Sequence, residues 1–243
     1  MAHLHYFFIP DGLEKANPSN IISLPSEEAH HALRVVRIRN DDIVSLFDGQ
    51  GHWSRGRFCA SGKREAEVII EESGFDQRDQ PAITLIQANL QRDQSMEDII
   101  RHATELGVYK VVFFDAARSV RTKKNRMEKW HRYAVEACKQ CGRAWLPEIV
   151  YEDTLQAALR HTNEISLALL LNAKPLPVSE ILTPSKAVSL IVGPEGDFNP
   201  EEYTLLDTHS KPVSLGNYIY RSEVASILGI TILQYLAGRL GPI

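Results

Sequence analysis

Two short apolar runs in the second part of the chain constrain the fold more than any other feature. Ile165 to Leu171 and Val188 to Val192 are apolar except for one serine each. Strands that are buried on both faces have this composition, and they belong to parallel sheets that helices cover on both sides. Helix patterns alternate with strand patterns from residue 83 onward. The sequence therefore predicts an α/β domain with a mainly parallel sheet.

The other elements of this part follow from shorter signals. Further strands are expected over Ile83–Ala88, Val111–Asp115 and Val213–Leu215, and helices over Ser95–Leu106, Lys124–Gln140 and Ser222–Leu240. Ser95 and Asp98 have the spacing of a capping box, and Gly107 and Gly142 end the first two helices. The run Asn199-Pro200-Glu201-Glu202 predicts another helix start, with a cap, a proline and acids in order.

The first 75 residues show a different pattern of secondary-structure signals. Short β-type runs, separated by turn residues, predict a small antiparallel barrel or sandwich; they cover Asp42–Phe47, His52–Ala60 and Glu65–Glu71. A helix is expected over Ser26–Val36, and Pro10 ends an edge strand at the start of the chain. The polar stretch from Gly74 to Pro81 is the expected linker. We therefore predict domains at residues 1–75 and 76–243.

Composition excludes several classes of protein. With 243 residues and 44% hydrophobic content, the chain can bury a sizeable core and is not a disordered protein. Three cysteines do not make a disulfide framework. No apolar stretch approaches the 18 or so residues of a membrane helix, and the first residues lack the pattern of a signal peptide. We expect a cytoplasmic protein without a membrane segment.

Basic residues are concentrated in one segment of an otherwise acidic chain. The net charge is −4, yet the segment from Arg118 to Arg143 contains nine basic and two acidic residues. Such a segment is either a face that binds phosphates or a solvated helix surface, and charge alone does not decide between them.

Cys138-Lys139-Gln140-Cys141 is a lone C-x-x-C motif near a helix end. A structural zinc site needs four ligands, and no second pair of this kind exists, so no metal is predicted. A redox dithiol and two semi-buried helix cysteines remain as alternatives.

Two glycine-containing loops follow apolar strands near the C-terminal end. Gly193 to Phe198 follows one strand, and Leu215 to Glu223 follows another. Open α/β sheets bind ligands at the carboxyl ends of their strands, and glycine exposes the backbone to a ligand. The loops predict a small-molecule site, against the alternative of plain turns.

Short motifs spread over nearly the whole chain resemble, in their order and spacing, those of the ribosomal small-subunit RNA (uridine-N3) methyltransferases of the SPOUT superfamily. The matching pieces are His31 with Arg34–Arg37, Leu46–Gly49, Thr104–Val108, Arg118-Ser119, Glu136–Arg143, Pro147–Ile149, Gly193–Gly196, Leu215-Gly216 and Arg221–Glu223.

The resemblance implies a PUA-like RNA-binding β-barrel followed by a SPOUT methyltransferase domain with a trefoil knot. It implies S-adenosylmethionine as cofactor, N3 of a uridine in 16S ribosomal RNA as methyl acceptor, and a homodimer. The implied cofactor-binding residues are Leu171, Asn172, Gly193, Pro194, Glu195, Gly196, Leu215, Gly216, Asn217, Tyr218, Ile219 and Tyr220.

Uracil N3 is a poor nucleophile until its proton leaves, so the reaction needs a base or a cation that stabilises the anion. We assign Glu223 as the candidate base and Arg221 as the candidate cation. A structural ion pair or helix-start contact is the alternative for both. The implied RNA-binding residues are Arg34, Arg37, Arg118, Arg121, Lys123, Lys124 and Arg143.

The last motif departs from the family pattern L-G-x-R-I-L-R-T-E-T-A. Tyr218 replaces an arginine, Tyr220 a leucine, and Ser222 and Val224 replace threonines. Two alternatives to a methyltransferase therefore stay open: a catalytically inert RNA-binding relative, and a thiol redox protein that uses Cys138 and Cys141.

Overall fold

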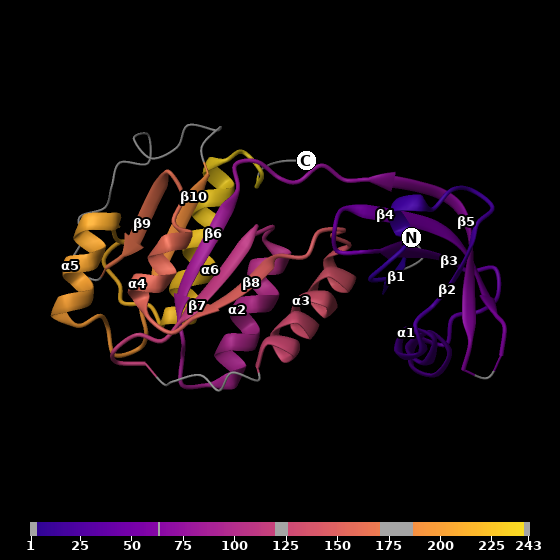
Figure 1. Cartoon of the computed structure of the whole chain (residues 1–243), viewed down its shortest axis with the longest axis horizontal. Helices are drawn as coiled ribbons and strands as arrows, with labels where there is room; N and C mark the ends of the chain where they lie inside the picture. Colours follow the sequence, from indigo (N-terminus) through magenta and orange to yellow (C-terminus); the bar gives the residue numbers. More distant parts are fainter. Residues whose placement is uncertain (1–3, 63, 120–125, 171–186, 241–243) are drawn as a thin grey trace. The chain divides into compact units, whose positions relative to one another are not determined.

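The computed structural model describes residues 4–62, 64–119, 126–170 and 187–240. Contacts divide the chain into two compact units, each described here by itself (Figure 1). One unit comprises Met1–Arg78 with Val135–Leu146, and the other Asp79–Ala134 with Pro147–Ile243.

A six-stranded sheet forms the centre of the second unit, and all its strands are parallel. In spatial order they are β11 (Lys211–Val213), β9 (Ile165–Leu169), β10 (Val188–Val192), β6 (Ile83–Ala88), β7 (Lys110–Phe114) and β8 (Glu148–Glu152). Every residue of the central strands β6 and β10 is buried. The predicted parallel sheet is confirmed.

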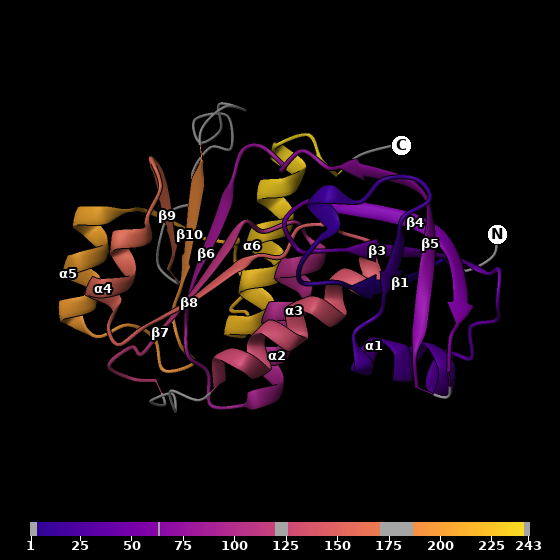
Figure 2. The ribbon, with the colours of Figure 1, turned by 45° about the vertical axis from the view of Figure 1, so that its right-hand side comes forward.

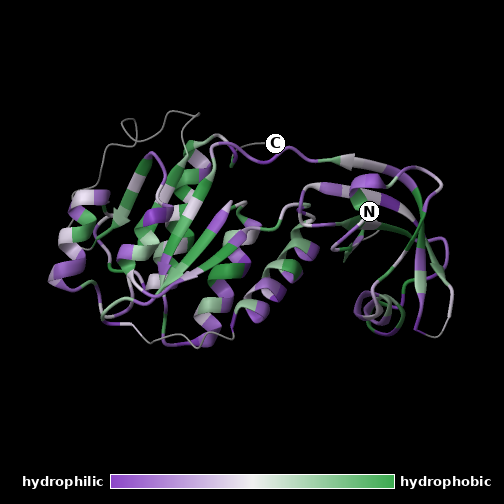
Figure 3. Ribbon diagram, in the orientation of Figure 1, coloured by the Kyte–Doolittle hydropathy of each residue, from purple (hydrophilic) through white to green (hydrophobic). Residues whose placement is uncertain are grey.

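Helices cover both faces of this sheet, as Figure 2 shows. On one side lie α2 (Asp93–Glu105), α6 (Ser222–Leu236) and the first part of α3 (Met127–Cys141); on the other lie α4 (Leu155–Ala158), the short helix η4 (Leu159–His161) and α5 (Pro200–His209). Figure 3 shows mostly hydrophobic residues along the central strands, and both hydrophobic and hydrophilic residues on the helices around them. The strands are therefore shielded from water on both faces, which explains their uninterrupted apolar sequence.

Helix ends follow the sequence signals at some positions and not at others. Asn199 caps α5 as predicted, and it does so in a reciprocal capping box with Glu202. Gly107, one residue beyond the C-cap of α2, and Gly142, directly after α3, adopt φ values of +76° and +75°. The box expected at Ser95 is wrong: α2 begins at Asp93, and Ser95 lies buried inside it.

The first unit is built on a five-stranded sheet, in the order β1 (His5–Phe8), β3 (Ile43–Phe47), β4 (His52–Ala60), β5 (Ala66–Phe75) and β2 (Ile21–Ser23). The short helices η1 (Leu13–Lys15), α1 (Ser26–His30) and η2 (His31–Val36) accompany it. β1 pairs with β3 in parallel, so the expectation of a purely antiparallel sheet is corrected. The reason is that helices separate β1 from its partner, so no tight hairpin joins the two strands.

The second half of α3 packs on the sheet of the first unit. Val135, Cys138 and Ala144 lie with Phe47 in a hydrophobic cluster. The contacts therefore group residues 135–146 with the first unit, whereas the division expected at residue 75 places them in the C-terminal domain. The apolar face of α3 explains this grouping because it helps to cover the β-sheet.

A nearly buried ion pair joins α1 to α3. Lys139 Nζ lies 2.5 Å from Glu28 Oε1 and 3.0 Å from Glu136 Oε1, and the side chains of Lys139 and Glu28 are only 9% and 11% exposed. Lys139, one of the nine basic residues of the segment, therefore does not belong to a phosphate-binding face.

Replacing Lys139 with methionine should lower the free energy of unfolding by about 3 kcal/mol at neutral pH, because Glu28 would stay buried without its cation. Burial raises the pKa of Glu28, and Lys139 opposes that shift. Without Lys139 the buried carboxyl holds its proton to higher pH, so the loss should shrink as pH falls and Glu28 becomes neutral. Denaturant unfolding at several pH values measures this. Lys129→Met, at a 42% exposed lysine of the same helix, is the control and should change stability little.

Candidate functional site

A pocket of about 340 Å³ lies where the carboxyl ends of β9, β10 and β11 meet. This is the edge of a parallel sheet at which ligands bind, and the volume is within the range of small-molecule sites. The pocket is lined by Leu169, Leu170, Val192, Gly193, Pro194, Glu195, Asp197, Ser214, Leu215, Gly216, Tyr218, Ile219, Tyr220, Arg221, Ser222 and Ala225.

Gly193 and Gly216 of the lining occupy positions that disfavour any residue with a side chain. Gly216 has φ +102°, a conformation that side chains rarely adopt, and a Cβ there would meet no atom within 4 Å. A Cβ on Gly193 would lie 2.8 Å from the ring of Phe198. Both loops thus present backbone to the pocket, in a wall that is otherwise largely apolar.

The loop after β10 is held in place by contacts from three sides. Glu195 accepts a hydrogen bond from the backbone N–H of Gln91 at 3.1 Å. Arg118 donates to the carbonyl oxygens of Gly196 and Phe198 at 3.2 and 3.3 Å. Asp197, whose φ is +60°, accepts bonds from the Tyr203 hydroxyl. Burial, and then this carboxylate, raise the pKa of Tyr203 to about 12, so the phenol stays a donor.

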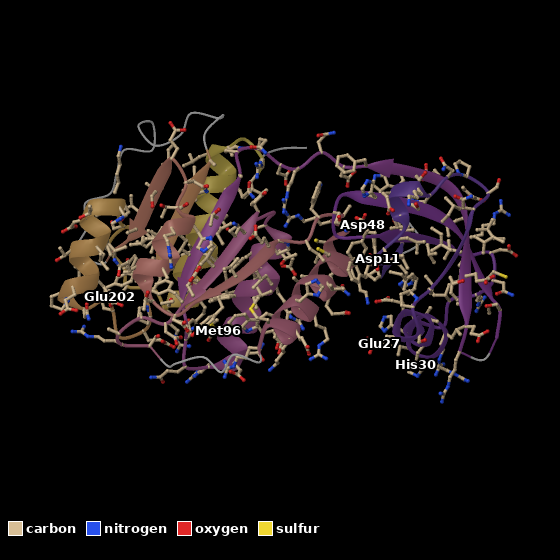
Figure 4. The ribbon with its side chains drawn as sticks, in the orientation of Figure 1. Asp11, Glu27, His30, Asp48, Met96 and Glu202 are labelled. Carbon is tan, nitrogen blue, oxygen red and sulfur yellow. The ribbon has the colours of Figure 1, made fainter. Side chains whose placement is uncertain are left out.

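A further bond fixes the start of α5. Glu202 accepts a hydrogen bond from the backbone N–H of Ala117 at 2.8 Å, besides its bond in the capping box. Glu202 lies at the first turn of α5 (Figure 4). The loops after β7 and β10 are thus connected to the same helix end.

The start of α6 is anchored to the sheet by a buried polar network. Ser222 donates to the Gly193 carbonyl at 2.5 Å and accepts from Gln87 Nε2 at 2.9 Å. Ser226 donates to the amide oxygen of Gln87. Gln87 and Ser226 are fully buried. Ser222 replaces a threonine of the family pattern, and it retains the hydroxyl that this network needs.

Replacing Ser222 with alanine should lower the free energy of unfolding by about 1–3 kcal/mol, because the half-buried Gly193 carbonyl and the buried Gln87 amide each lose a partner. Ser222→Thr keeps the hydroxyl and should stay close to the wild type. Urea unfolding of the two variants measures the difference. Equal stability of the alanine and threonine variants would show that the network does not hold α6 in place.

Most of the residues expected to bind a cofactor come together in this pocket. Gly193, Pro194, Glu195, Leu215, Gly216, Tyr218, Ile219 and Tyr220 line it. Gly196 and Asn217 are in the same loops but not in the lining, and a Cβ on Gly196 would face Arg118 at 3.2 Å. Leu171 and Asn172 lie outside the described residues.

The two candidate catalytic residues differ in position. Arg221 lines the pocket and is exposed, directly before α6. Glu223 is in the first turn of α6, half-buried, and is not part of the lining. The structure therefore brings Arg221, but not Glu223, to the pocket.

The expected RNA-binding residues are spread over both units. Arg34 and Arg37 are exposed on and directly after η2, and Arg118 is exposed on the loop that contacts Gly196. Arg143 is half-buried. Arg121, Lys123 and Lys124 lie outside the described residues. Two further basic residues of the segment, Arg126 and Lys129, contact Asp93.

Several lining residues are not among the cofactor-binding or catalytic residues expected from the sequence. Asp197 and Ser222 lie within the two predicted loops, whereas Leu169, Leu170, Val192, Ser214 and Ala225 lie outside them. Leu169 and Val192 are the last residues of β9 and β10, and they could have been predicted because open α/β sheets bind ligands at the carboxyl ends of their strands. Ala225 could not, because only the packing of α6 on β10 brings it to the pocket.

The structure does not favour thiol redox chemistry. Cys138 is fully buried. Burial, and then Cys141, raise the pKa of Cys138 to about 12. A reactive thiolate needs a lowered pKa. The described residues contain no group of histidine, cysteine and acidic side chains that could hold a metal ion. Within the same ranges, no helix is long and apolar enough to cross a membrane.

Comparison with known proteins identifies both parts of the chain. The family model of an RNA methyltransferase domain matches residues 78–234, and that of an RNA methyltransferase PUA domain matches residues 24–71. Ribosomal RNA small subunit methyltransferase E of Rickettsia conorii is 29% identical over 91% of this chain and 92% of its own.

Solved structures agree with these matches. Ribosomal RNA small subunit methyltransferase E of Neisseria gonorrhoeae, bound to S-adenosylmethionine, has a TM-score of 0.86 at 27% identity, over 96% of this chain and 98% of its own. A methyltransferase of Legionella pneumophila, also with bound S-adenosylmethionine, has a TM-score of 0.84 at 28% identity over the same shares. The chain belongs to the RNA methyltransferase domain family, and its methyltransferase domain follows a PUA domain of the RNA methyltransferases.

Proposed function

We propose that this chain transfers a methyl group from S-adenosylmethionine to 16S ribosomal RNA, at N3 of a uridine. The observation that carries the proposal is the pocket at the ends of β9, β10 and β11, inside the segment that matches the RNA methyltransferase domain. The similar enzymes whose names and structures are given above support the cofactor and the RNA class.

The pocket fits S-adenosylmethionine in size and chemistry. Apolar residues such as Leu169, Val192 and Leu215 offer a surface for the adenine ring. Gly193 and Gly216 leave backbone groups free to bond polar atoms of the cofactor. When bound, the cofactor supplies an electrophilic methyl group. We propose that Leu171 and Asn172 close the remaining side, and that Gly196 and Asn217 hold the loops in shape.

The chain must remove the N3 proton of uracil or stabilise the anion that forms. Arg221, at the pocket, is suited to stabilise that anion through its guanidinium group. Glu223 follows two residues later on α6, and we propose that it takes the proton once RNA is in place. Glu195, whose side chain is a carboxylate in the pocket lining, is the alternative candidate for the base.

The target uridine must be unpaired or flipped out of its helix, because N3 lies on the pairing edge. We propose that basic residues contact phosphates around it. They are the exposed Arg34, Arg37 and Arg118, the half-buried Arg143, and Arg121, Lys123 and Lys124 of the basic segment, which lie outside the described residues.

RNA affinity should fall steeply with salt despite the negative net charge, because each bound phosphate releases counterions. Combining Arg34→Ala with Arg37→Asn should reduce the slope of log affinity against log salt by about 1.5, close to the value for two phosphate contacts. Asparagine is chosen at Arg37 because φ is +62° there. Lys15→Ala, at an exposed lysine of the same unit, is the control. An unchanged slope in the double variant would remove these arginines from the interface.

We further propose that the methyltransferase domain has the trefoil knot and the PUA domain the barrel closure of the family that the sequence resembles. A homodimer built on α6 is proposed from its exposed apolar side chains, among them Tyr235 and Ile232, which are 66% and 42% exposed. Sedimentation analysis tests the dimer. A ribosomal substrate makes the cytoplasm the expected location.

Calorimetric titration with S-adenosylmethionine tests the first step of this function. Saturable binding at one site per chain supports it. Absence of binding, with RNA affinity retained, would instead support the alternative of an inert RNA-binding relative, in which the changes at Tyr218 and Tyr220 have abolished the cofactor site.

A further inference from the structure

A second, smaller pocket lies on the sheet of the first unit, and it shares no lining residue with the pocket described above. Its volume is about 190 Å³, below the range of 300–1,000 Å³ typical of sites for whole small molecules. Tyr6, Phe47 and Trp53 supply aromatic walls, and Ser45, Arg55 and Asp76 supply polar groups.

The strand register explains why these side chains meet. Tyr6 pairs with Ser45 across β1 and β3, and Phe47 pairs with Trp53 across β3 and β4. Because side chains alternate along a strand, Trp53 and Arg55 lie on the same face of β4. The second half of α3 covers the neighbouring part of that face through Val135 and Cys138.

The pocket is rigid at the turn between β3 and β4. Asp48, labelled in Figure 4, is buried and accepts hydrogen bonds from the backbone N–H groups of Gln50 and His52 at 2.7 and 3.1 Å. These bonds fix the hairpin that pairs Phe47 with Trp53. The aromatic walls are therefore already in place before a ligand binds, which lowers the entropy cost of binding.

The polar groups of the pocket can bond a ligand. Arg55 bonds Glu72 through Nη1 at 2.8 Å, and its guanidinium group has further N–H donors. The Tyr6 hydroxyl and the Asp76 carboxylate add a second donor and an acceptor to the lining. The pocket therefore suits a ligand that offers both hydrogen-bond donors and acceptors.

We propose that this pocket binds one unpaired base of the RNA, with guanine preferred. Proteins recognise splayed-out bases by stacking them on aromatic side chains and bonding their edges. A carboxylate only accepts hydrogen bonds, and the pairing edge of guanine alone offers two adjacent donors, N1–H and N2–H₂. Arginine donates to O6 and N7 of guanine, which matches Arg55. The inference rests on the proposed function for the nature of the ligand, but it concerns a pocket of the first unit, whereas methyl transfer is proposed for the pocket of the second unit.

Fluorescence anisotropy with short single-stranded oligoribonucleotides tests the inference on the full chain. The probes are heptamers of uridine with one central guanosine, adenosine, cytidine or uridine. Stacking and edge contacts predict that the guanosine probe binds about tenfold tighter than the uridine probe. Trp53→Ala should weaken binding of all four probes, and Asp76→Asn should abolish the preference for guanosine alone.

A matched pair of arginines separates base recognition from simple charge. Arg55 and Arg57 lie on the same strand, and each pairs with a glutamate of β5. Only Arg55 lines the pocket. Arg55→Ala should therefore lose the preference for guanosine, whereas Arg57→Ala should keep it.

The outcomes distinguish this inference from the proposed function. Equal affinity for the four probes, or equal effects of the two arginine variants, would overturn the base pocket. Asp76 is exposed, so Asp76→Asn decides the matter even if Trp53→Ala fails to fold. Absence of S-adenosylmethionine binding in the wild-type chain would contradict the proposed function and leave a guanosine preference intact.

Discussion

Replacing Ala225 with leucine should weaken S-adenosylmethionine binding by about 10- to 100-fold, the range expected when extra volume enters a filled site. Ala225 lies in the first turns of α6 and lines the pocket. Leucine is a good helix former, so the helix itself should persist. Calorimetric titration measures the affinity.

The neighbouring residue provides the control for this variant. Val224 is 38% exposed and does not line the pocket. Val224→Leu should therefore bind the cofactor like the wild type. If both variants bind with wild-type affinity, the cofactor lies elsewhere; if both lose it equally, α6 itself has been disturbed.

Replacing Glu223 with glutamine should lower the turnover rate by about 10²–10⁴, the usual contribution of one general base. Affinity for S-adenosylmethionine should change little, because Glu223 is outside the lining. The deficit should shrink at high pH, where uracil loses its N3 proton without help. Single-turnover rates across the pH range measure this behaviour.

Arg221→Ala should behave differently from Glu223→Gln. A guanidinium group supplies charge rather than basicity, so its loss should persist as pH rises. Glu201→Gln, at an exposed glutamate in the first turn of α5, is the control and should turn over normally. If Glu223→Gln turned over at the wild-type rate and Glu195→Gln turned over slowly, Glu195 rather than Glu223 would be the base.

The fold of the second unit could be predicted in large part from the sequence, because its central strands are buried on both faces. Such strands show continuous apolar residues, as Val188 to Val192 does. β8 was missed because it lies at the sheet edge and is only partly buried: its sequence, Glu148–Glu152, has a glutamate at each end and lacks the continuous apolar run of a central strand. β2 was missed because three residues are too short to show a pattern.

The candidate site could be predicted only where the loops contain glycine. Gly193 and Gly216 were expected, and both line the pocket. The long-range bonds of Ser222 to Gly193 and Gln87 could not be predicted, because they join residues 29 and 135 positions apart in the chain. The same limit applies to Lys139: the sequence shows only that it is one of the nine basic residues of the segment, and its contact with Glu28 shows that it is nearly buried.

Methyl transfer to uridine N3 can be measured by incubating the purified chain with small ribosomal subunits and S-adenosylmethionine that carries a labelled methyl group. The ribosomal RNA is then digested, and its nucleosides are separated. We expect the label in 3-methyluridine, and we expect Arg221→Ala to reduce it greatly. Label in a different nucleoside, or no label in RNA from a chain that binds the cofactor, would contradict the proposed function.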